Sequence, residues 1–452
     1  MQLPCVDEAR SAGGATATAK AIDHAASTSK PTPARSSGDA AKQLRIMGLL
    51  ITDFPGQTHV AMWRLGRAIA RRGIKVVPIS TKRPTDTAGV HPFLLEAAEG
   101  TYYVWPPSAK WVLRGTPSLL TRGWRAVGYL MRCKESGWAK RFKRLPMIVL
   151  AAGLAARCRA ERMDFLLVHS FAEAAHLVTM SRLLGGPAYG LRLGGDLDVY
   201  GVDHLSKTRH AALLVPAAEN NADELRDHIR IDDDRLLTTW LGVDADRFGA
   251  IERVPPRPGE AVRMLTVARL NYTKGHRYAF QAVRLLADRG VDVRYDVVGS
   301  GDYLTALQTE VAEMGVAERV TFHGAKDEAG VLAALREAHV FVLPSIGQGE
   351  ASPVALCEAM ASGLPAVATV IGGTPQMIAD GVDGRLVPQE DGDAIADAVA
   401  GLIADPQRWL SVSEAAKRRG AREFDTAIVA DRVVGAIERR LAGLPAEEPT
   451  DG

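Results

Sequence analysis

Two glutamates eight positions apart, Glu350 and Glu358, are the side chains of this chain best suited to holding a polar ligand. Glu350 precedes a predicted helix with Ser352 as N-cap and Pro353 as first helical residue, and Glu358 lies within that helix. The free backbone N–H groups of a helix start favour an anion. The segment could therefore seat a pyrophosphate between two acceptors, with ribose at one end and a hexose at the other.

The same segment resembles the signature of retaining glycosyltransferases of family 4 (glycosyl transferases group 1). The signature continues here as Ala359-Met-Ala-Ser-Gly-Leu-Pro365. The resemblance covers roughly residues 45 to 440, and other motifs follow in the order of the family: Val267-Ala-Arg-Leu270, Lys274-Gly-His276, Val298-Gly-Ser-Gly301, Phe341-Val-Leu-Pro-Ser345 and Gly372-Gly-Thr-Pro-Gln376. It implies an α/β protein of GT-B fold, in which two Rossmann-like doubly wound domains face across a cleft.

The resemblance also implies roles for single residues. Arg269 and Lys274 follow a predicted strand on one loop, where two cations could meet the charge that develops on a leaving phosphate, without a metal cofactor. Glu350 would contact the donor sugar, and Glu358 would accept hydrogen bonds from the ribose hydroxyls. Further substrate contacts are expected from Gly299, Ser352, Pro353 and Val354.

The N-terminal half carries weaker signals. Gly56, in the loop Phe54-Pro-Gly-Gln-Thr58, would permit close approach of backbone to the sugar and diphosphate. Family members often have a pocket histidine three residues before an aspartate, but here Leu193 or Gly195 occupies that place. His169, at the end of the preceding strand, is a candidate to face the ligand, although a structural role for it remains open.

Two aspartates follow the position of the missing histidine. Asp196 or Asp198 could supply the missing polar group, and Asp196 is the candidate for substrate binding. Asp196-Leu-Asp198 also matches the short metal-binding Asp-x-Asp pattern of another glycosyltransferase fold, in which carboxylates bind Mg²⁺ or Mn²⁺ between phosphates. The rest of the chain fits that fold poorly, and we expect no metal.

Composition limits the classes of protein that the chain can belong to. It has 452 residues, of which 47% are apolar, and a formal net charge of +2. That length suggests about two or three domains, and the charge does not favour nucleic acid as a partner. The four cysteines, Cys5, Cys133, Cys158 and Cys357, lack metal-ligand spacing and predict free thiols in a reducing compartment.

Predicted strands alternate with helices in two series, which is typical of parallel sheets covered by helices. Strands are predicted at 45–51, 74–79, 165–168, 188–193 and 213–216, then at 264–267, 294–298, 320–322 and 340–343. Helices are predicted at 59–72, 172–184 and 221–228, then at 276–288, 304–314 and 330–338. The apolar run 147–156 predicts a buried helix that is too short to cross a bilayer.

These series define the expected domains. Residues 1–42 are predicted to be a disordered tail, 43–252 an N-terminal Rossmann-like acceptor domain, 253–261 a linker rich in proline, and 262–425 a C-terminal nucleotide-sugar donor domain. By analogy with the family, residues 426–452 are expected to form a helix that returns toward the N-terminal domain, followed by a tail.

The region from Tyr102 to Arg144 is the strongest feature outside the donor domain. Ten Lys or Arg and a single acid, Glu135, lie between Lys110 and Arg144, interleaved with tryptophans. Basic residues attract anionic lipid headgroups, and Trp favours the membrane interface. The pattern favours peripheral membrane contact through 102–144, while a solvated helical face and nucleic-acid binding are the alternatives.

Together the patterns predict a retaining hexosyltransferase. The donor would be a UDP-sugar or GDP-sugar, the acceptor a glycan or lipid-linked glycan, and the setting surface or exopolysaccharide biosynthesis. We expect a cytoplasmic protein that can contact the inner face of the cytoplasmic membrane. The alternatives are a phosphorylase or epimerase of the same fold, which the order of motifs disfavours, and a catalytically impaired scaffold subunit that binds nucleotide sugar, which the missing histidine suggests.

Overall fold

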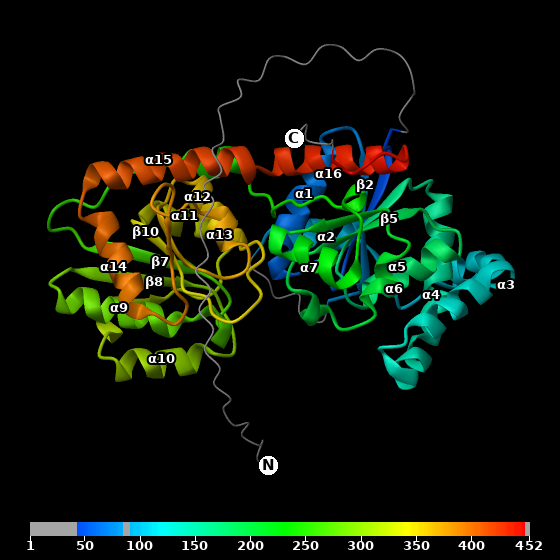
Figure 1. Ribbon diagram of the computed structural model, residues 1–452, viewed down its shortest axis with the longest axis horizontal. Helices are drawn as coiled ribbons and strands as arrows, with labels where there is room; N and C mark the ends of the chain where they lie inside the picture. The colour runs from blue at the N-terminus through cyan, green and yellow to red at the C-terminus, as the bar shows by residue number, and fades with distance from the viewer. Residues whose placement is uncertain (1–42, 85–90, 448–452) are drawn as a thin grey trace, which may run out of the picture. The chain divides into compact units, whose positions relative to one another are not determined.

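The computed structural model describes residues 43–84 and 91–447. The predicted tail at 1–42 lies outside the described residues, as do residues 85–90 and 448–452. Within the described ranges the chain forms two parallel sheets, each of six strands (Figure 1). The predicted α/β class with two doubly wound sheets is therefore confirmed.

The first sheet belongs to the N-terminal half and has the strand order β3-β2-β1-β4-β5-β6. The direction of winding reverses between β1 and β4, and ligands of such sheets bind beyond the carboxyl ends of the strands at this point. β1, β4 and β6 are buried almost throughout, as strands of a parallel sheet covered by helices require. The bounds of all strands in this sheet are β1 (Ile46–Ile51), β2 (Lys75–Lys82), β3 (Tyr102–Trp105), β4 (Phe165–His169), β5 (Ala188–Leu193) and β6 (Leu213–Pro216).

Helices of the N-terminal half connect these strands. Two of them, α3 (Ala109–Arg132) and α4 (Gly137–Ala160), have 24 residues each and pack against one another. Gly115 permits their close approach, because a Cβ at that position would lie 2.7 Å from the backbone of Ala152. The apolar run 147–156 lies in α4 and is mostly buried, as predicted. The other helices are α1 (Val60–Ala70), α2 (Phe93–Gly100), α5 (Glu173–Leu183), α6 (His204–Thr208) and α7 (Glu219–Ile229).

The second sheet repeats this architecture in the order β12-β11-β10-β7-β8-β9. Its strands are β7 (Val262–Val267), β8 (Val293–Val298), β9 (Val320–Phe322), β10 (Val340–Leu343), β11 (Ala366–Thr369) and β12 (Arg385–Val387). The helices are α9 (His276–Asp288), α10 (Leu304–Glu313), α11 (Glu328–Glu337), α12 (Val354–Ala361), α13 (Thr374–Met377), α14 (Gly392–Ile403) and α15 (Pro406–Glu423).

The chain passes between the halves at two places that lie side by side. Val243 accepts a hydrogen bond from the backbone of Thr426, and its own N–H donates to Phe424. Val243 and Phe248, in the short helix α8 (Ala245–Gly249), already belong to a core of the C-terminal half. The chain therefore enters the C-terminal half before the predicted linker at 253–261. The buried apolar side chains of Val243 and Phe248, rather than the prolines of the linker, mark where the chain passes from one half to the other.

The last helix, α16 (Thr426–Leu441), packs against α1 of the N-terminal half. Its buried face joins the core formed by β1 and α1, through Val429, Val433 and Ile437. In Figure 1 this helix follows α15 at the red end of the colour range, and α15 itself packs on α12. The C-terminal segment thus joins both halves covalently and through packing.

Candidate functional site

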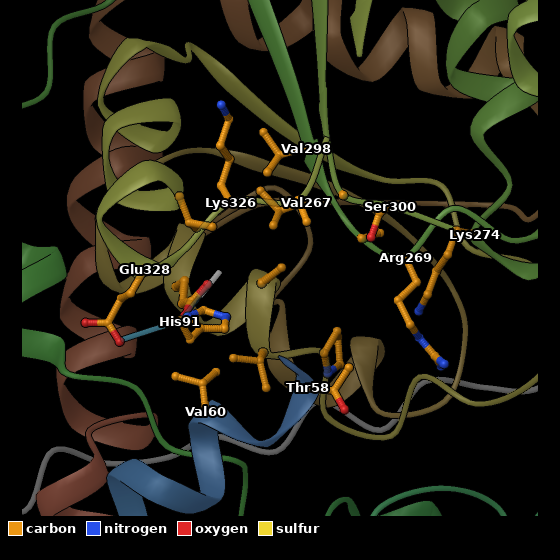
Figure 2. A pocket seen from close by; sticks show the side chains of 18 of the residues that line it. Thr58, Val60, His91, Val267, Arg269, Lys274, Val298, Ser300, Lys326 and Glu328 are labelled. Atoms are coloured by element: carbon orange, nitrogen blue, oxygen red, sulfur yellow. The ribbon is translucent and has the colours of Figure 1, made fainter. Parts of the chain in front are cut away.

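Residues of both halves line one cavity of about 330 Å³. The C-terminal half contributes the carboxyl ends of β7, β8 and β10 and the start of α12, which is where ligands bind in doubly wound sheets. The N-terminal half contributes Thr58, Val60, Arg64 and His91. Figure 2 shows Arg269 and Lys274 on one side of this cavity and Glu328 and His91 on the other.

Lys274 and Glu350 form an ion pair at the cationic end of the cavity. Glu350 is only 5% exposed, and its Oε1 accepts hydrogen bonds from the Lys274 ammonium and, at 2.6 Å, from the Ser345 hydroxyl. Arg269 is exposed, and its guanidinium forms no ion pair with any residue in the described part of the chain. The pair fixes the direction of the Lys274 side chain, whereas the Arg269 side chain has its donors available for an anion.

Glycines bring the cationic loop against its neighbours. Gly275 has a φ of +60°, and a Cβ there would clash with the carbonyl oxygen of Pro344, just after β10. Gly299 has a φ of +150°, and a Cβ there would clash with the carbonyl oxygen of Ala268. Both positions need glycine, since a side chain would be strained and would push apart loops that line the cavity. Gly299 itself lines the cavity.

Glu358 lies at the acidic end of the cavity. It is 6% exposed, and its Oε1 accepts a hydrogen bond of 2.9 Å from Nη2 of Arg64, on α1 of the other half. Burial raises the pKa of Glu358 above its usual range, and the positive charge of Arg64 opposes that rise. The same guanidinium contacts Glu328, at the start of α11, at 2.7 and 3.0 Å. Two carboxylates thus share one cation.

The helix that carries Glu358 begins one residue later than expected. Pro353 is the N-cap of α12 and makes no side-chain cap, so the prediction of Ser352 as N-cap is wrong. Instead, the Ser352 hydroxyl accepts a hydrogen bond of 2.9 Å from the backbone of Leu241 and ties α12 to the crossover between the halves. Pro353 and Val354 line the cavity, but Ser352 does not.

Comparison with known proteins identifies the C-terminal half. Residues 249–419 match the family model described as glycosyl transferases group 1. This match confirms the resemblance read from the motifs, and it covers every residue of the cavity that the second sheet and its loops contribute.

Curated relatives of this chain bear the names of glycosyltransferases. WcaL of Salmonella typhimurium, whose name assigns it to colanic acid biosynthesis, is 33% identical over 253 residues, which are 55% of this chain and 60% of WcaL. The GDP-mannose-dependent alpha-(1-6)-phosphatidylinositol monomannoside mannosyltransferase of Mycolicibacterium smegmatis is 32% identical over 50% of this chain and 58% of its own. The chain thus spans less than two thirds of the length of these relatives.

Solved structures show the same fold. HepE of Anabaena, in complex with UDP, superposes with a TM-score of 0.66 over 89% of this chain and 100% of its own, at 16% identity. WaaG, a glycosyltransferase involved in lipopolysaccharide biosynthesis, superposes with a TM-score of 0.57 over 87% of this chain and 99% of its own, at 15% identity. At these identities the likeness establishes the architecture, and the predicted GT-B fold is confirmed.

The family's pocket histidine has no counterpart at the expected place. Leu193 is fully buried at the end of β5, and Gly195 is buried just beyond it. The ring of His169, at the end of β4, lies close to this position, because a Cβ on Gly194 would be 3.7 Å from its Cε1. Burial lowers the pKa of His169 to about 3, so the ring is neutral, and its Nδ1 has no partner in the described structure.

Asp196 and Gly56 lie outside the lining of the cavity. Asp196 precedes a short 3-10 turn and accepts a long hydrogen bond of 3.4 Å from Asn221. Gly56 has an extended backbone (φ −144°) that any residue can adopt, but a Cβ there would lie 3.1 Å from Nδ1 of His59, which would have to shift. Across the described ranges, no group of three or more His, Cys, Asp or Glu side chains is placed to hold a metal ion.

Sequence patterns missed Arg64 and His91 of the N-terminal half and Glu328 of α11, whereas Thr58 belongs to a loop that the sequence analysis had singled out. Arg64 lies on an amphipathic helix like many surface arginines, and its two partners are 264 and 294 residues away in sequence. His91 precedes α2, and Glu328 follows the N-cap of α11. Of these, only Glu328 carried a local signal, because an acid in the first turn of a helix is favoured whether or not it has a function.

Proposed function

We propose that this protein is a retaining glycosyltransferase that moves a hexose from a UDP-sugar or GDP-sugar to a glycan or lipid-linked glycan. One observation carries the proposal: a single cavity has the cations Arg269 and Lys274 on one side and Glu328 on the other (Figure 2). The buried acid Glu358 also lines this cavity and shares the cation Arg64 with Glu328. A nucleotide sugar has the matching order of groups, since an anionic diphosphate separates a ribose diol from a hexose. The family of residues 249–419 supports the same reaction class.

In the proposed complex, the diphosphate lies against Arg269 and Lys274, and the ribose hydroxyls donate to Glu358. Glu350, held by Lys274 and Ser345, accepts from a hydroxyl of the donor sugar. As the bond between the anomeric carbon and the phosphate oxygen breaks, the two cations stabilise the charge that develops on the diphosphate. The acceptor oxygen attacks from the same face, and its proton passes to the leaving phosphate. We propose that no metal ion is needed.

The acceptor would bind at the carboxyl edge of the N-terminal sheet. Buried polar atoms without partners gather there within the described ranges, namely Thr52 Oγ1, His169 Nδ1, Arg192 Nε and Nη1, and Thr239 Oγ1. Buried polar groups without partners are rare in folded proteins, and hydroxyl groups of a sugar could pair with them. This edge adjoins the cavity through the loop after β1, whose Thr58 lines it.

The names of the relatives support a setting for the reaction. WcaL, the Erwinia amylovora glycosyltransferase AmsK of amylovoran biosynthesis, and the mycobacterial mannosyltransferases carry names that refer to polysaccharides or phosphatidylinositol glycans. We propose the synthesis of a surface or exopolysaccharide at the inner face of the cytoplasmic membrane. The alternative is an impaired scaffold that binds nucleotide sugar, and Leu193 or Gly195 at the place of the family histidine favours it. Turnover of the donor separates this alternative from the enzyme.

The α3–α4 surface supports the membrane contact. Trp124, Trp138 and Phe142 are 70%, 58% and 64% exposed, although large aromatic side chains are usually covered. No described helix is long and apolar enough to span a bilayer. Around these aromatics the exposed basic residues are Lys110, Arg114, Arg122, Arg125, Arg132, Lys134, Lys140 and Lys143. We propose that this surface lies on an anionic membrane, with the aromatics at the interface and the cations on headgroups.

A substitution at the cationic end tests the proposed reaction. Lys274→Ala should lower kcat by about 100-fold or more, because one donor to the developing charge is lost. Arg277→Ala is the matched control, since Arg277 is an exposed cation at the start of α9 that does not line the cavity. We expect the control to stay within about twofold of wild type. A near-normal rate for Lys274→Ala would show that Lys274 does not stabilise the charge that develops on the diphosphate.

A further inference from the structure

Arg64 is the one charged residue of the N-terminal half, within the described ranges, that lines the cavity and contacts Glu358. It lies on α1, which is fixed to the N-terminal sheet through Met62, Leu65 and Ile69 in the core of that half. Its guanidinium is 11% exposed, and it contacts Glu358 and Glu328 of the C-terminal half at 2.9 and 2.7 Å. The side chain thus reaches from one half of the protein to the ribose end of the proposed donor site.

The hydrogen bonds of Arg64 are incomplete. Nε and Nη2 donate to the two carboxylates, but Nη1 is buried and has no partner in the described part of the chain. A buried guanidinium nitrogen without an acceptor is costly, because it has lost its water and gained nothing in exchange. Since Arg64 lines the cavity, the missing acceptor is one that a ligand can supply.

Glu358 also has an unused acceptor. Arg64 occupies its Oε1, and no described side chain donates to its Oε2. A ribose hydroxyl that donates to Oε2 could at the same time accept from Nη1 of Arg64, because a hydroxyl is both donor and acceptor. Carboxylate and guanidinium would then bind one diol from the two halves of the protein.

We propose that Arg64 is a specificity-determining residue for the ribose of the donor nucleotide, which it binds jointly with Glu358. This role rests on the proposed function, and it adds a residue of the N-terminal half to the proposed nucleotide site. Glu328 holds the other edge of the guanidinium, and Arg247 holds Glu328 in turn. These ion pairs fix the plane of the Arg64 guanidinium. Because the group is rigid, the contacts of Nε and Nη2 also set the direction in which Nη1 points.

Lysine cannot take over this role. A lysine ammonium is a single point from which three N–H bonds radiate, whereas the arginine fork separates its donors along a plane. Arg64→Lys keeps a positive charge between the two acids, but it cannot contact both carboxylates and a ribose hydroxyl in the same geometry. The lysine variant therefore separates the charge of Arg64 from its directed donors, and it avoids leaving the buried carboxylate of Glu358 without a cation.

The test compares ribose with a ribose lacking its hydroxyls. UDP, GDP and their 2′,3′-dideoxy forms are titrated by calorimetry into wild type, Arg64→Ala, Arg64→Lys and Arg67→Ala. Arg67 is the matched control, because it lies one turn along α1, is 57% exposed and pairs with Glu96 of the same half. We expect Arg64→Ala to weaken binding of the preferred ribonucleotide by about tenfold or more, Arg64→Lys by at least about threefold, and Arg67→Ala not at all.

The dideoxynucleotide decides between recognition and a merely structural role. If Arg64 acts on the ribose hydroxyls, the loss in both Arg64 variants should fall below about twofold for the dideoxy form. An equal loss for both forms, or no loss for either, would overturn the inference while leaving the proposed function standing. If wild type binds neither UDP nor GDP, the proposed function fails, and this inference fails with it. Should Arg64→Ala not fold, Arg64→Lys gives the same comparison.

Discussion

At the scale of single residues, burial keeps two histidines neutral. His176, on α5, and His276, at the start of α9, are 0% and 1% exposed. Burial lowers the pKa of His176 to about 3 and that of His276 to about 4, with smaller contributions from nearby cations. Neither side chain lines the cavity, so their titration concerns the stability of the fold rather than the chemistry of the site.

These values predict acid sensitivity. An unfolded histidine has a pKa near 6.5, so between pH 6.5 and 4 the unfolded chain binds more protons than the folded one. The stability that depends on these histidines being neutral is therefore complete above pH 6.5. The free energy of unfolding decreases as the pH falls toward 4. At pH 5.5 each histidine should reduce it by about 1.4 kcal/mol relative to pH 7.5.

Urea unfolding of variants at these two pH values measures the contribution. His176→Asn should lose about 1.4 kcal/mol less than wild type between pH 7.5 and 5.5. His228→Asn, at an exposed position of α7, is the control and should match wild type. An unchanged pH dependence for His176→Asn would show that His176 does not titrate as its burial implies.

Single residues also show why only part of the site could be predicted. Glu350 and Glu358 are close in sequence and lie in a motif, so the local pattern places both in the cavity. Arg64 has ordinary helix neighbours, and its function depends on residues of the other half. Ser352 suits an N-cap by type, but a tertiary contact to Leu241 takes its hydroxyl. Local sequence reports local geometry and not contacts between distant segments.

At the scale of elements, buried strands were predicted best. The strands at 213–216, 320–322 and 340–343 and the helix at 276–288 agree with the structure to the residue. Short apolar runs between polar turns define such elements. β11 (Ala366–Thr369) was not predicted, because four small residues give no clear pattern. The extents of α3 and α4 were also missed, since Pro117 and Pro146 suggest breaks that these helices tolerate.

The α3–α4 surface gives a prediction at this scale. Replacing Arg122, Arg125, Lys140 and Lys143 by glutamine should weaken binding to vesicles that contain anionic lipid by about tenfold or more, because each cation near such a surface adds roughly 1 kcal/mol. Cosedimentation measures this binding with two kinds of vesicle. One kind contains neutral lipid only, and the other contains roughly 30:70 anionic to neutral lipid, which gives about the physiological surface charge. Arg144 is left intact, since it is buried and pairs with Glu173 and Asp203.

A control separates the patch from general surface charge. Four glutamine substitutions at exposed basic residues of the C-terminal half, Arg277, Arg284, Arg289 and Arg408, remove the same charge elsewhere. We expect these to keep vesicle binding close to wild type. If both quadruple variants bind vesicles as wild type does, α3 and α4 present an ordinary solvated face.

At the scale of the whole molecule, the two halves have different tasks and share one cavity. The cavity residues of the C-terminal half all lie within 249–419, and the N-terminal half adds Arg64, His91 and Thr58. The helix α16 and the crossover at Val243 join the two halves. Donor binding in such a cavity should therefore depend on residues from both halves, as the account of Arg64 requires.

The proposed transferase reaction is tested by incubating the purified protein with a panel of UDP-sugars and GDP-sugars, with and without EDTA. A glycan or lipid-linked glycan acceptor mixture is present, and the release of nucleotide is measured. We expect release from one donor of the panel, coupled to transfer of its hexose, at a rate that EDTA does not change. Release that EDTA abolishes would contradict the metal-free clamp of Arg269 and Lys274. Nucleotide binding without release from any donor would contradict the transferase and leave the scaffold.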